Sequence, residues 1–512
     1  MATASMSCSI PVSMTIEEKP YVPSLPSPQN LKQTATITSS SSVDDGDTPA
    51  LLHRSLVTRP HLVDHADGSY LYLADGRSIL DACGGAAVAV IGHGNTEVIA
   101  ATAAQMQRTS YIHTGAYTTT AAEDLAKFIL ECGTSIDGQD SYFAHGLTRA
   151  FFVGSGSEAN ESAMKIARQY FFERGELQRQ HYVSRRQAYH GNTFGSMSIS
   201  SVLGRRVPYE DVLLPNVSFV NPAFEYHHRD NNETEEEYAE RLLHELEAHF
   251  LDIGPEKIIS FIAEPVVGAT SGCVTAPKGY FSGVRSLCDK YGILLHFDEV
   301  MCGVGRTGSY FAFEQEDGDV LPDIVTIGKG LGGGYVPLAA MLINDRIVNT
   351  LHQGTSVFNH GHTFQAHPTA CSAALAVQKI IRREGLVSRC ADLGTKFGQR
   401  LRTEFGCCKY VGDVRGRGLF WALEFVKDKK TKTPFEASVG FGAQIHQMAF
   451  DLGVAVYPCV GTVDGVVGDH ILLAPPFNIF DDELDIIIST LRRAYHEVEL
   501  HYDSAIRGEV AA

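Results

Sequence analysis

From about residue 150 onward, short apolar runs alternate along the chain with segments that have the spacing of amphipathic helices. The run AFFV at 150–153 precedes a glycine turn and a segment predicted to be helical. The apolar residues on one face of that helix are Ala159, Ala163, Ile166, Ala167 and Tyr170. Further apolar runs follow in IISFIAEP, ILLHFDEV and DIVTIGKG, and a helix expected before ILLHFDEV should end at Tyr291-Gly292. This alternation favours an α/β fold with a mostly parallel sheet between layers of helices.

Charge and hydropathy exclude several classes of partner. The chain has 42 basic and 60 acidic residues and a formal net charge of −18, which argues against binding to nucleic acid or to anionic membrane surfaces. No apolar run reaches the roughly 18 residues that a membrane span requires. Eleven cysteines without a CxxC pair or a regular spacing favour reduced thiols in an intracellular compartment.

The first 48 residues differ in composition from the remainder. They are rich in Ser, Thr and Pro, and no arginine occurs before Arg54. A mitochondrial transit peptide would be rich in arginine, and a secretory signal would contain a continuous apolar core. We therefore predict a disordered leader and a cytoplasmic location.

A lysine among glycines is the first candidate for chemistry. Residues 323–335, DIVTIGKGLGGGY, contain a G-x-G-x-x-G pattern, but a dinucleotide site would need these glycines to open a helix. Here Gly-Gly-Gly is followed by Tyr335-Val336-Pro337, and glycine and proline disfavour a helix interior. A phosphate-binding P-loop is excluded as well, because no G-K-[ST] occurs in the chain. Lys329 instead suits covalent chemistry, since lysine amines form Schiff bases with carbonyl groups.

Three other features point to the same chemistry. Asp298 ends the buried-looking run GILLHFD, where a carboxylate is costly unless it meets a cation such as the pyridinium nitrogen of pyridoxal phosphate. In GSGSEAN, Gly156 and Ser157 would offer N–H groups and a hydroxyl to a phosphate at a helix N-terminus, although a simple N-cap explains the motif equally well. Tyr189, in AYHGNTFG, is either a ring-stacking aromatic or a core residue.

These motifs, in this order, resemble those of the class III pyridoxal-phosphate aminotransferases, in the branch of the omega-aminotransferases. The resemblance covers about residues 60 to 500. The matching stretches are FVGSGSEANESAMKIAR, AYHGNTFGSMSIS, FIAEPVVG, LLHFDEVMCGVGRTGSYFAFE, PDIVTIGKGLGGGYVPLAAM, GHTFQAHPTACSAAL and VRGRGLFWALEFVKD.

The resemblance implies an α/β fold of fold type I and a homodimer with active sites at the subunit boundary. It also implies the cofactor pyridoxal 5′-phosphate. A large cofactor-binding domain is expected between two segments that together form a smaller α+β domain. The predicted divisions are 1–48 for the leader, 49–105 for the N-terminal segment, 106–372 for the large domain, 373–505 for the C-terminal segment and 506–512 for a tail.

The resemblance assigns the central catalytic roles by position. Lys329 is similar to the Schiff-base lysine, and Asp298 to the partner of the pyridinium nitrogen. Gly156 and Ser157 are similar to the phosphate cradle, and Tyr189 to the aromatic residue that stacks on the cofactor ring.

Five further residues take roles from the same resemblance. His190 is grouped with the cofactor-binding residues, and Val300 is expected to press on the face of the ring opposite Tyr189. Thr363, in GHTF, resembles the hydroxyl that reaches the phosphate of the neighbouring subunit. Glu264, in AEP, is similar to the active-site glutamate of the family. Arg415, in VRGRG, aligns with a residue that binds a substrate carboxylate.

Three histidines, His360, His362 and His367, raise the alternative of a zinc site. The resemblance places them in the loop that contacts the cofactor phosphate, which explains their proximity without an ion. We therefore predict no metal.

The implied reaction moves an amino group from an amine or amino-acid donor to a keto-acid or carbonyl acceptor, with Lys329 transferring the proton. Two related reactions remain open, a decarboxylating transamination and an amine shift within one molecule, because one fold supports several chemistries. A non-catalytic scaffold is a remote alternative, since every residue that the chemistry requires is present.

Substrate choice is the least determined property. Members of the family that use glutamate with ω-amines carry a second glutamate five residues after the AEP glutamate, and it pairs with the carboxylate-binding arginine. Here that position is Ala269. Arg415 therefore needs another acceptor or must turn to solvent, because an unpaired buried charge costs several kcal/mol. We predict a small keto acid such as pyruvate as the acceptor.

Overall fold

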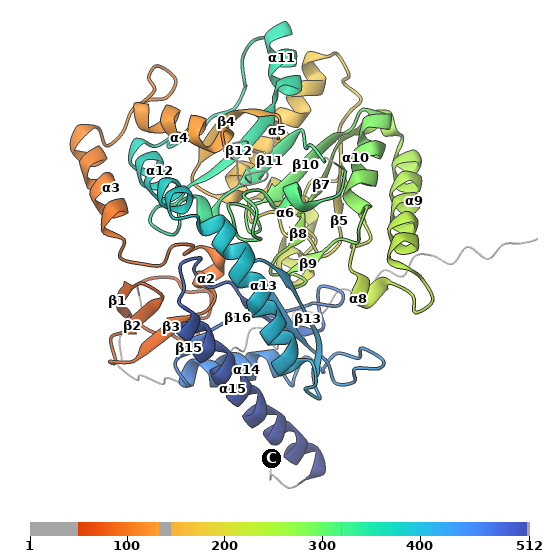
Figure 1. The fold of residues 1–512 in the computed structure, drawn as a ribbon. Helices are drawn as coiled ribbons and strands as arrows, with labels where there is room; N and C mark the ends of the chain where they lie inside the picture. The colour runs from red at the N-terminus through yellow and green to blue at the C-terminus, as the bar shows by residue number, and fades with distance from the viewer. Residues whose placement is uncertain (1–49, 133–144, 319, 509–512) are drawn as a thin grey trace, which may run out of the picture.

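The computed structural model describes residues 50–132, 145–318 and 320–508. Its centre is a seven-stranded sheet (Figure 1). In spatial order the strands are β4 (Leu147–Val153), β12 (Ala339–Asn344), β11 (Ile324–Ile327), β10 (Leu294–Glu299), β7 (Ile258–Ala263), β5 (His181–Arg185) and β6 (Val217–Val220). Only β12 runs antiparallel to its two neighbours in this sheet, so the predicted α/β fold with a mostly parallel sheet is confirmed.

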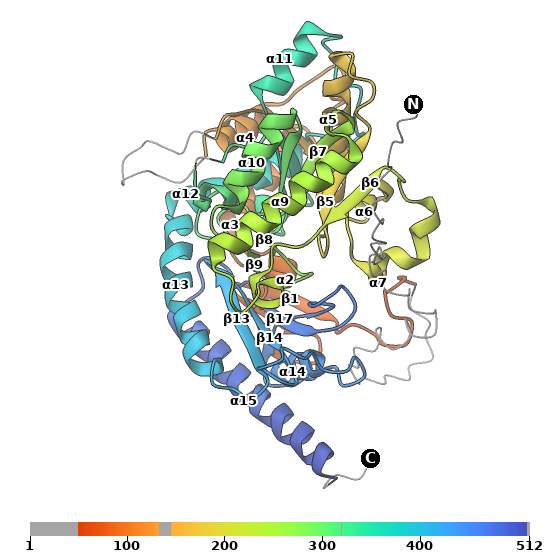
Figure 2. The same ribbon diagram turned by 90° about the vertical axis from the view of Figure 1, so that its right-hand side faces the viewer.

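Helices cover both faces of the sheet (Figures 1 and 2). The strand β10 illustrates the reason, because its successive side chains point to opposite faces. Leu295 and Phe297 enter the main hydrophobic core, whereas Leu294 enters a second core. Since both faces are apolar, each must be covered. The helices packed around this sheet are α3 (Thr96–Arg108), α4 (Thr120–Leu130), α5 (Gly156–Glu173), α9 (Glu235–Ile253), α10 (Tyr280–Tyr291), α11 (Asp345–Gln353) and α12 (Pro368–Arg383).

The helix α5 follows the spacing found in the sequence. All five residues predicted for its apolar face are buried: Ala159, Ala163, Ile166, Ala167 and Tyr170. Three of the helix's residues, Asn160 among them, are polar yet also buried. The apolar face therefore fixes α5 on the sheet, and its N-terminus is left beside the ends of the strands.

Two further helices begin or end where their sequences favour it. Thr234 caps α9 through a reciprocal pair of hydrogen bonds with Glu237, which satisfies N–H groups that have no partner within the helix. Helix α10 ends before Gly292, whose φ of 66° is in the left-handed region that glycine adopts easily. The predicted end of this helix is confirmed.

The C-terminal part contains a second sheet and three of its own helices. In spatial order its strands are β13 (Val411–Arg417), β14 (Phe420–Phe425), β17 (Asp469–Leu473) and β16 (Tyr457–Val460). The helices are α13 (Leu386–Phe405), α14 (Phe441–Asp451) and α15 (Asp481–Arg507).

The N-terminal and C-terminal segments share a third sheet. It contains β1 (Val63–Asp67), β2 (Tyr70–Leu73) and β3 (Ser78–Asp81) together with β15 (Val454–Ala455), which pairs in parallel with β3. A small domain built from both ends of the chain would contain such a pairing between an N-terminal and a C-terminal strand. Helix α12 crosses the boundary predicted between residues 372 and 373, so that position lies within a helix.

Short elements complete the described chain. They are α2 (Gly84–Ala87), α6 (Phe194–Ser198), α7 (Leu203–Arg206), α8 (Glu225–His228), β8 (Val266–Val267), β9 (Val274–Thr275), η1 (Val207–Val212), η2 (Pro255–Lys257), η3 (Ala312–Gln315) and η4 (Lys329–Leu331). The predicted leader lies outside the described residues, as does the end of the predicted tail. Among the described helices, none combines the length and apolar character needed to cross a membrane.

Candidate active site

The predicted site residues follow strands of the seven-stranded sheet that run in the same direction. Asp298 lies near the end of β10, Lys329 follows β11 and Glu264 follows β7. Tyr189 follows β5, and Gly156 follows β4. Because the carboxyl ends of parallel strands meet at one edge of a sheet, these residues converge there, which is where α/β folds bind ligands.

Asp298 is a buried carboxylate with three hydrogen-bond donors around it. Its Oδ2 accepts from His190 Nδ1 at 2.7 Å and from Asn160 Nδ2 at 2.9 Å, and its Oδ1 accepts from the Val300 N–H at 3.0 Å. Burial acts to raise the pKa of Asp298, but the hydrogen bond and charge of His190, with the Val300 N–H, outweigh it and hold this pKa below its ordinary value. The side chain is therefore an anion at neutral pH.

Asn160 connects Asp298 to a buried polar network. Besides its bond to Asp298, Asn160 Nδ2 donates to the His190 carbonyl oxygen at 2.7 Å. Its Oδ1 accepts from Thr326 Oγ1 at 2.9 Å, and Thr326 Oγ1 lies 3.2 Å from His296 Nε2. The network fixes the carboxylate of Asp298 in position. Asn160 is not among the residues predicted from the sequence, although its place four residues after Gly156 puts it one helical turn further along α5.

Lys329 lies two residues beyond β11, with its amine in a largely buried environment. Burial lowers the pKa of this amine from 10.5 to about 8, while the charges of Glu264 and Asp298 act in the opposite direction. Its φ of 43° is in the left-handed region, which costs about 1–2 kcal/mol for a residue other than glycine. After η4, no long helix follows before β12, so the described loop lacks the helix of a dinucleotide site.

The glycines beside Lys329 allow close packing. A Cβ on Gly328 would lie 3.3 Å from both Val300 Cγ1 and Ala339 Cβ, and a Cβ on Gly330 would lie 2.9 Å from Val90 Cγ1. Side chains at these positions would push the lysine loop away from the sheet. The glycines therefore hold Lys329 close to the end of β10.

The N-terminus of α5 forms the opposite wall. Gly156 and Ser157 begin this 18-residue helix, whose first backbone N–H groups have no acceptor within the helix and carry partial positive charge. A Cβ on Gly156 would lie only 2.7 Å from Val300 Cγ1, so only glycine leaves this cradle open. Ser157 Oγ accepts from the Asn192 N–H at 3.0 Å. These features favour an anionic group such as a phosphate.

Tyr189 and Glu264 are joined through the backbone. Glu264 Oε1 accepts from the Tyr189 N–H at 3.2 Å, and Glu264 Oε2 accepts from the Gly268 N–H at 3.0 Å. Burial raises the pKa of Glu264, and the charge of Asp298 adds to this effect. Tyr189 is half-buried, and the guanidinium of Arg205 lies 4.7 Å from the centre of its ring. The two residues thus border the same space as Lys329.

Thr363, His360 and His362 lie in the loop between α11 and α12, and His367 is the N-cap of α12. Thr363 is exposed, as a contact to a neighbouring subunit would require. The two ring nitrogens of His360 lie 2.9 Å from Ser162 Oγ and 2.9 Å from Lys165 Nζ, and its ring packs against that of His362. In the described chain, no group of three or more His, Cys, Asp or Glu residues is arranged to hold a metal ion.

Arg415, predicted to bind a substrate carboxylate, is already paired. Its Nη1 lies 2.7 Å from Glu424 Oε2 and 3.0 Å from Asp413 Oδ2, and its Nε donates to the Gly272 carbonyl oxygen at 2.6 Å. Nη2 donates to the Ser271 carbonyl oxygen.

Because position 269 is an alanine and not a glutamate, Arg415 needs another acceptor. The structure shows that this acceptor is mainly Glu424. This residue lies on β14, beside β13, and its side chain is only 1% exposed. Two carboxylates and two carbonyl oxygens surround the guanidinium of Arg415, and the two carboxylates neutralise its charge. Arg415 is therefore paired within the chain, and its role as the carboxylate ligand stays a prediction.

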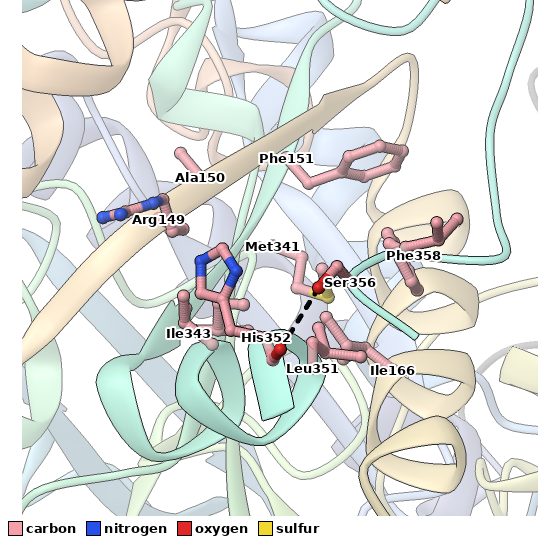
Figure 3. Close-up of a pocket in the computed structure, with 12 residues that line it drawn as sticks. Arg149, Ala150, Phe151, Ile166, Met341, Ile343, Leu351, His352, Ser356 and Phe358 are labelled. Atoms are coloured by element: carbon pink, nitrogen blue, oxygen red, sulfur yellow. Dashed lines mark hydrogen bonds between the residues drawn. The ribbon is translucent and has the colours of Figure 1, made fainter. Parts of the chain in front are cut away.

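A separate cavity of about 220 Å³ lies away from these residues (Figure 3). Side chains of β4, β12, α11 and the loop after α11 line it, among them Phe151, Met341 and Phe358. None of the predicted site residues lines this cavity, so it is not the candidate active site.

A comparison with protein families identifies the class of protein. A family model described as aminotransferase class-III matches residues 53–495. The chain therefore belongs to the class III aminotransferases, enzymes of class EC 2.6.1.- that transfer amino groups with pyridoxal 5′-phosphate as the cofactor. The predicted family, enzyme class and cofactor are confirmed.

Individual relatives agree with this family. An uncharacterized aminotransferase of Schizosaccharomyces pombe is 45% identical over 460 residues, covering 90% of this chain and 98% of the relative. A vanillin aminotransferase of Capsicum chinense is 33% identical, covering 86% of this chain and 92% of the relative. The PLP-bound structure of an amine transaminase from an uncultivated Pseudomonas species has a TM-score of 0.80 at 31% identity, covering 88% of this chain and 99% of that one.

The residues at the sheet edge suit pyridoxal phosphate. The open cradle at Gly156 matches the anionic phosphate, because a Cβ there would collide with Val300. The anionic Asp298 matches a protonated ring nitrogen. The lowered pKa of Lys329 matches an amine that reacts with an aldehyde.

Proposed function

We propose that this transaminase works through Lys329, which would form the covalent bond to the cofactor. The amine of the substrate would then displace Lys329, and the freed lysine amine would move a proton between substrate and cofactor. The observation that carries the proposal is the position of Lys329 beside Glu264 and Asp298, with a pKa lowered to about 8. A lysine amine with an ordinary pKa would be almost entirely protonated at neutral pH, whereas this one has an appreciable neutral fraction. Only the neutral amine can bond to a carbonyl carbon or accept a proton.

Three groups support the remaining roles. Asp298, an anion held by His190 and Asn160, keeps the ring nitrogen of the cofactor protonated. The bound cofactor then supplies an electron sink for the negative charge that develops on the reacting carbon. Gly156 and Ser157 hold the phosphate at the N-terminus of α5.

Tyr189 is the aromatic residue proposed to stack on the cofactor ring. Its backbone N–H is bonded to Glu264, which positions the ring beside the lysine loop. Val300 is the counterpart on the other side of the cofactor, because its side chain already contacts the space above Gly156 and Gly328. Together these two residues orient the ring and exclude water from it.

The proposal includes a homodimer in which Thr363 of each chain contacts the phosphate bound by the other. The loop around Thr363 exposes apolar surface that favours burial in an interface. Phe364 is 65% exposed and Tyr111 is 42% exposed, and their rings lie 5.9 Å apart. This contact would close each active site with a residue from the partner.

The donor is an amine or amino acid, and the acceptor is a keto acid or another carbonyl compound. The relative named a vanillin aminotransferase supports including aldehydes among the carbonyl compounds tested. A decarboxylating transamination is separated from a plain one by measuring CO₂, which would be released in step with amine transfer only in the former.

The variant Lys329→Ala tests the proposal. It should retain the fold, measured by circular dichroism, and lose transamination of a donor panel with pyruvate and 2-oxoglutarate. Lys290→Ala is the matched control, because Lys290 is an exposed lysine paired with Glu247 on another helix. Turnover of Lys329→Ala within tenfold of wild type would overturn the proposal.

A further inference from the structure

The cavity in Figure 3 lies on one face of the seven-stranded sheet, at the edge of that sheet. Successive side chains of a strand point to opposite faces, so Arg149 and Phe151 of β4 share one face. The register of β4 against β12 places Ile343 opposite Arg149 and Met341 opposite Phe151. All four residues line the cavity. Since β4 is the last strand on this side of the described sheet, no neighbouring strand closes the cavity there.

Two helices and a loop form the other walls. Ile166 of α5 and Leu351 of α11 line the cavity. Phe358, in the loop after α11, closes it beside Phe151, and the centres of the two rings lie 5.5 Å apart. Val357 of the same loop also lines the cavity and is 54% exposed. The cavity is therefore open to solvent in the single chain.

The loop that closes the cavity is fixed to α5 by hydrogen bonds. Gln169 Nε2 donates to the Val357 carbonyl oxygen at 2.6 Å, and Gln169 Oε1 accepts from the Asn359 N–H at 3.0 Å. His360 Nε2 lies 2.9 Å from Ser162 Oγ. The wall is thus in place before any ligand binds, so little conformational freedom is lost on binding.

The size and the lining of the cavity suit an apolar group of about one ring. Its volume is about 220 Å³. An enclosed apolar cavity of roughly 150 Å³ holds one benzene molecule and stays free of water. Apart from Arg149, His352 and Ser356, the residues that line the cavity are apolar. An aromatic ring or a short branched chain would therefore leave water for an apolar surface, which is favourable.

The charged residue of the lining lies at one end. In Figure 3, Arg149 and His352 lie toward one side of the cavity, and Phe151 and Phe358 toward the other. Arg149 Nη1 donates to the Thr148 carbonyl oxygen at 2.8 Å, and no carboxylate within the described ranges pairs with this guanidinium. Its other N–H groups can bind an anion, because a guanidinium presents parallel donors to the two oxygens of a carboxylate.

The acidic residues on the surrounding elements do not line the cavity. Asp345, at the start of α11, accepts from Thr148 Oγ1 at 2.7 Å. Glu173, at the end of α5, accepts from the Thr355 N–H at 3.0 Å. The cavity therefore combines an apolar interior with a cation at one end, and its lining contains no carboxylate that would repel an anion.

We propose that this cavity is a second ligand site, which binds a small carboxylic acid carrying one aromatic ring or a short branched chain. The apolar part of the ligand lies beside Phe151 and Phe358, and its carboxylate pairs with Arg149. This inference goes beyond the proposed function and does not depend on it, because none of the predicted active-site residues lines the cavity.

The test combines calorimetry with crystallography of the holoenzyme. The probe is 3-(4-bromophenyl)propanoate, because its ring suits the apolar interior and its bromine can be located by anomalous scattering. We expect the bromine beside Phe151 and Phe358 and the carboxylate at Arg149. The matching alcohol, 3-(4-bromophenyl)propan-1-ol, should bind about three- to tenfold more weakly, because it cannot form a charge-assisted hydrogen bond.

Variants separate the role of the cation from that of the apolar walls. Arg149 is exposed, so Arg149→Gln should keep the fold and bind the probe about three- to tenfold more weakly. Arg149→Lys should restore part of the affinity. Arg402→Gln is the matched control, because Arg402 is also exposed and its guanidinium lies 4.7 Å from the Trp421 ring in the C-terminal part. This control should bind the probe as wild type does.

Three results would overturn the proposal. The first is a bromine that is found only beside Lys329. The second is equal affinity for the acid and the alcohol, together with unchanged binding of the acid by Arg149→Gln. The third is a lack of binding to the holoenzyme in its solution assembly, as would occur if a second copy of the chain covered the cavity.

Discussion

The replacement of Asp298 by asparagine perturbs the electrostatics of the site without changing its shape. The carboxylate is 4% exposed and accepts three hydrogen bonds, so the amide occupies the same space. What disappears is the negative charge that keeps the cofactor ring nitrogen protonated.

The loss in rate follows from Coulomb's law. Two unit charges about 4 Å apart interact by about 4 kcal/mol at an effective dielectric constant of about 20. If this interaction stabilises the transition state, its loss slows the reaction by about a thousandfold. The variant should also unfold more easily, by about 1–3 kcal/mol, because the amide NH₂ group must face a donor, either the Val300 N–H or the pair His190 and Asn160.

The assay is single-turnover amine transfer at saturating pyridoxal phosphate, so that weaker cofactor binding does not affect the rate. Asp323→Asn provides the control. Asp323 is another buried aspartate, but it lies before β11, at the opposite end from Lys329, and pairs with Arg285 and Arg346. The control should lose stability and keep its rate. A rate for Asp298→Asn within tenfold of wild type would refute the role of Asp298.

Three other outcomes are expected. Since burial lowers the pKa of Lys329 to about 8, the neutral amine becomes the main form above pH 8. Recombination of pyridoxal phosphate with the apoenzyme should therefore speed up as the pH rises through about 8 and level off beyond it, and a midpoint near the ordinary value of 10.5 would contradict this. Gly156→Ala places a Cβ 2.7 Å from Val300 Cγ1, and this overpacking costs about 1–3 kcal/mol. Cofactor binding, measured by equilibrium dialysis, should weaken about 10- to 100-fold. Unchanged affinity would show that Gly156 does not hold the phosphate. Thr363→Ala should weaken cofactor binding by about 1.5–3 kcal/mol, whereas Thr363→Ser, which keeps the hydroxyl, should not. A fully active monomer in sedimentation would refute the proposal that Thr363 contacts the phosphate bound by the other chain.

Local sequence patterns predicted those parts of the fold that depend on neighbouring residues. The apolar spacing located α5, and Gly292 marked the end of α10. The direction of β12 was not predictable in this way, because a buried strand has the same apolar run whether it is parallel or antiparallel to its neighbours.

The candidate site shows the same limit. Lys329 and Asp298 stand out because each is a charged residue next to an apolar strand. The pairing of Arg415 with Glu424 depends on how β13 aligns with β14, and the contact of Arg205 with Tyr189 depends on the fold of the chain between them. Neither contact follows from the spacing of residues along the sequence.

Reduction of the holoenzyme with borohydride, followed by mass spectrometry of its peptides, tests the central claim most directly. Borohydride fixes the bond between a lysine and pyridoxal phosphate, so the modified residue can be identified. We predict one modified residue per chain, Lys329, and loss of the visible absorbance. Modification of a different lysine, or no modification while the enzyme is active, would contradict the assignment of Lys329.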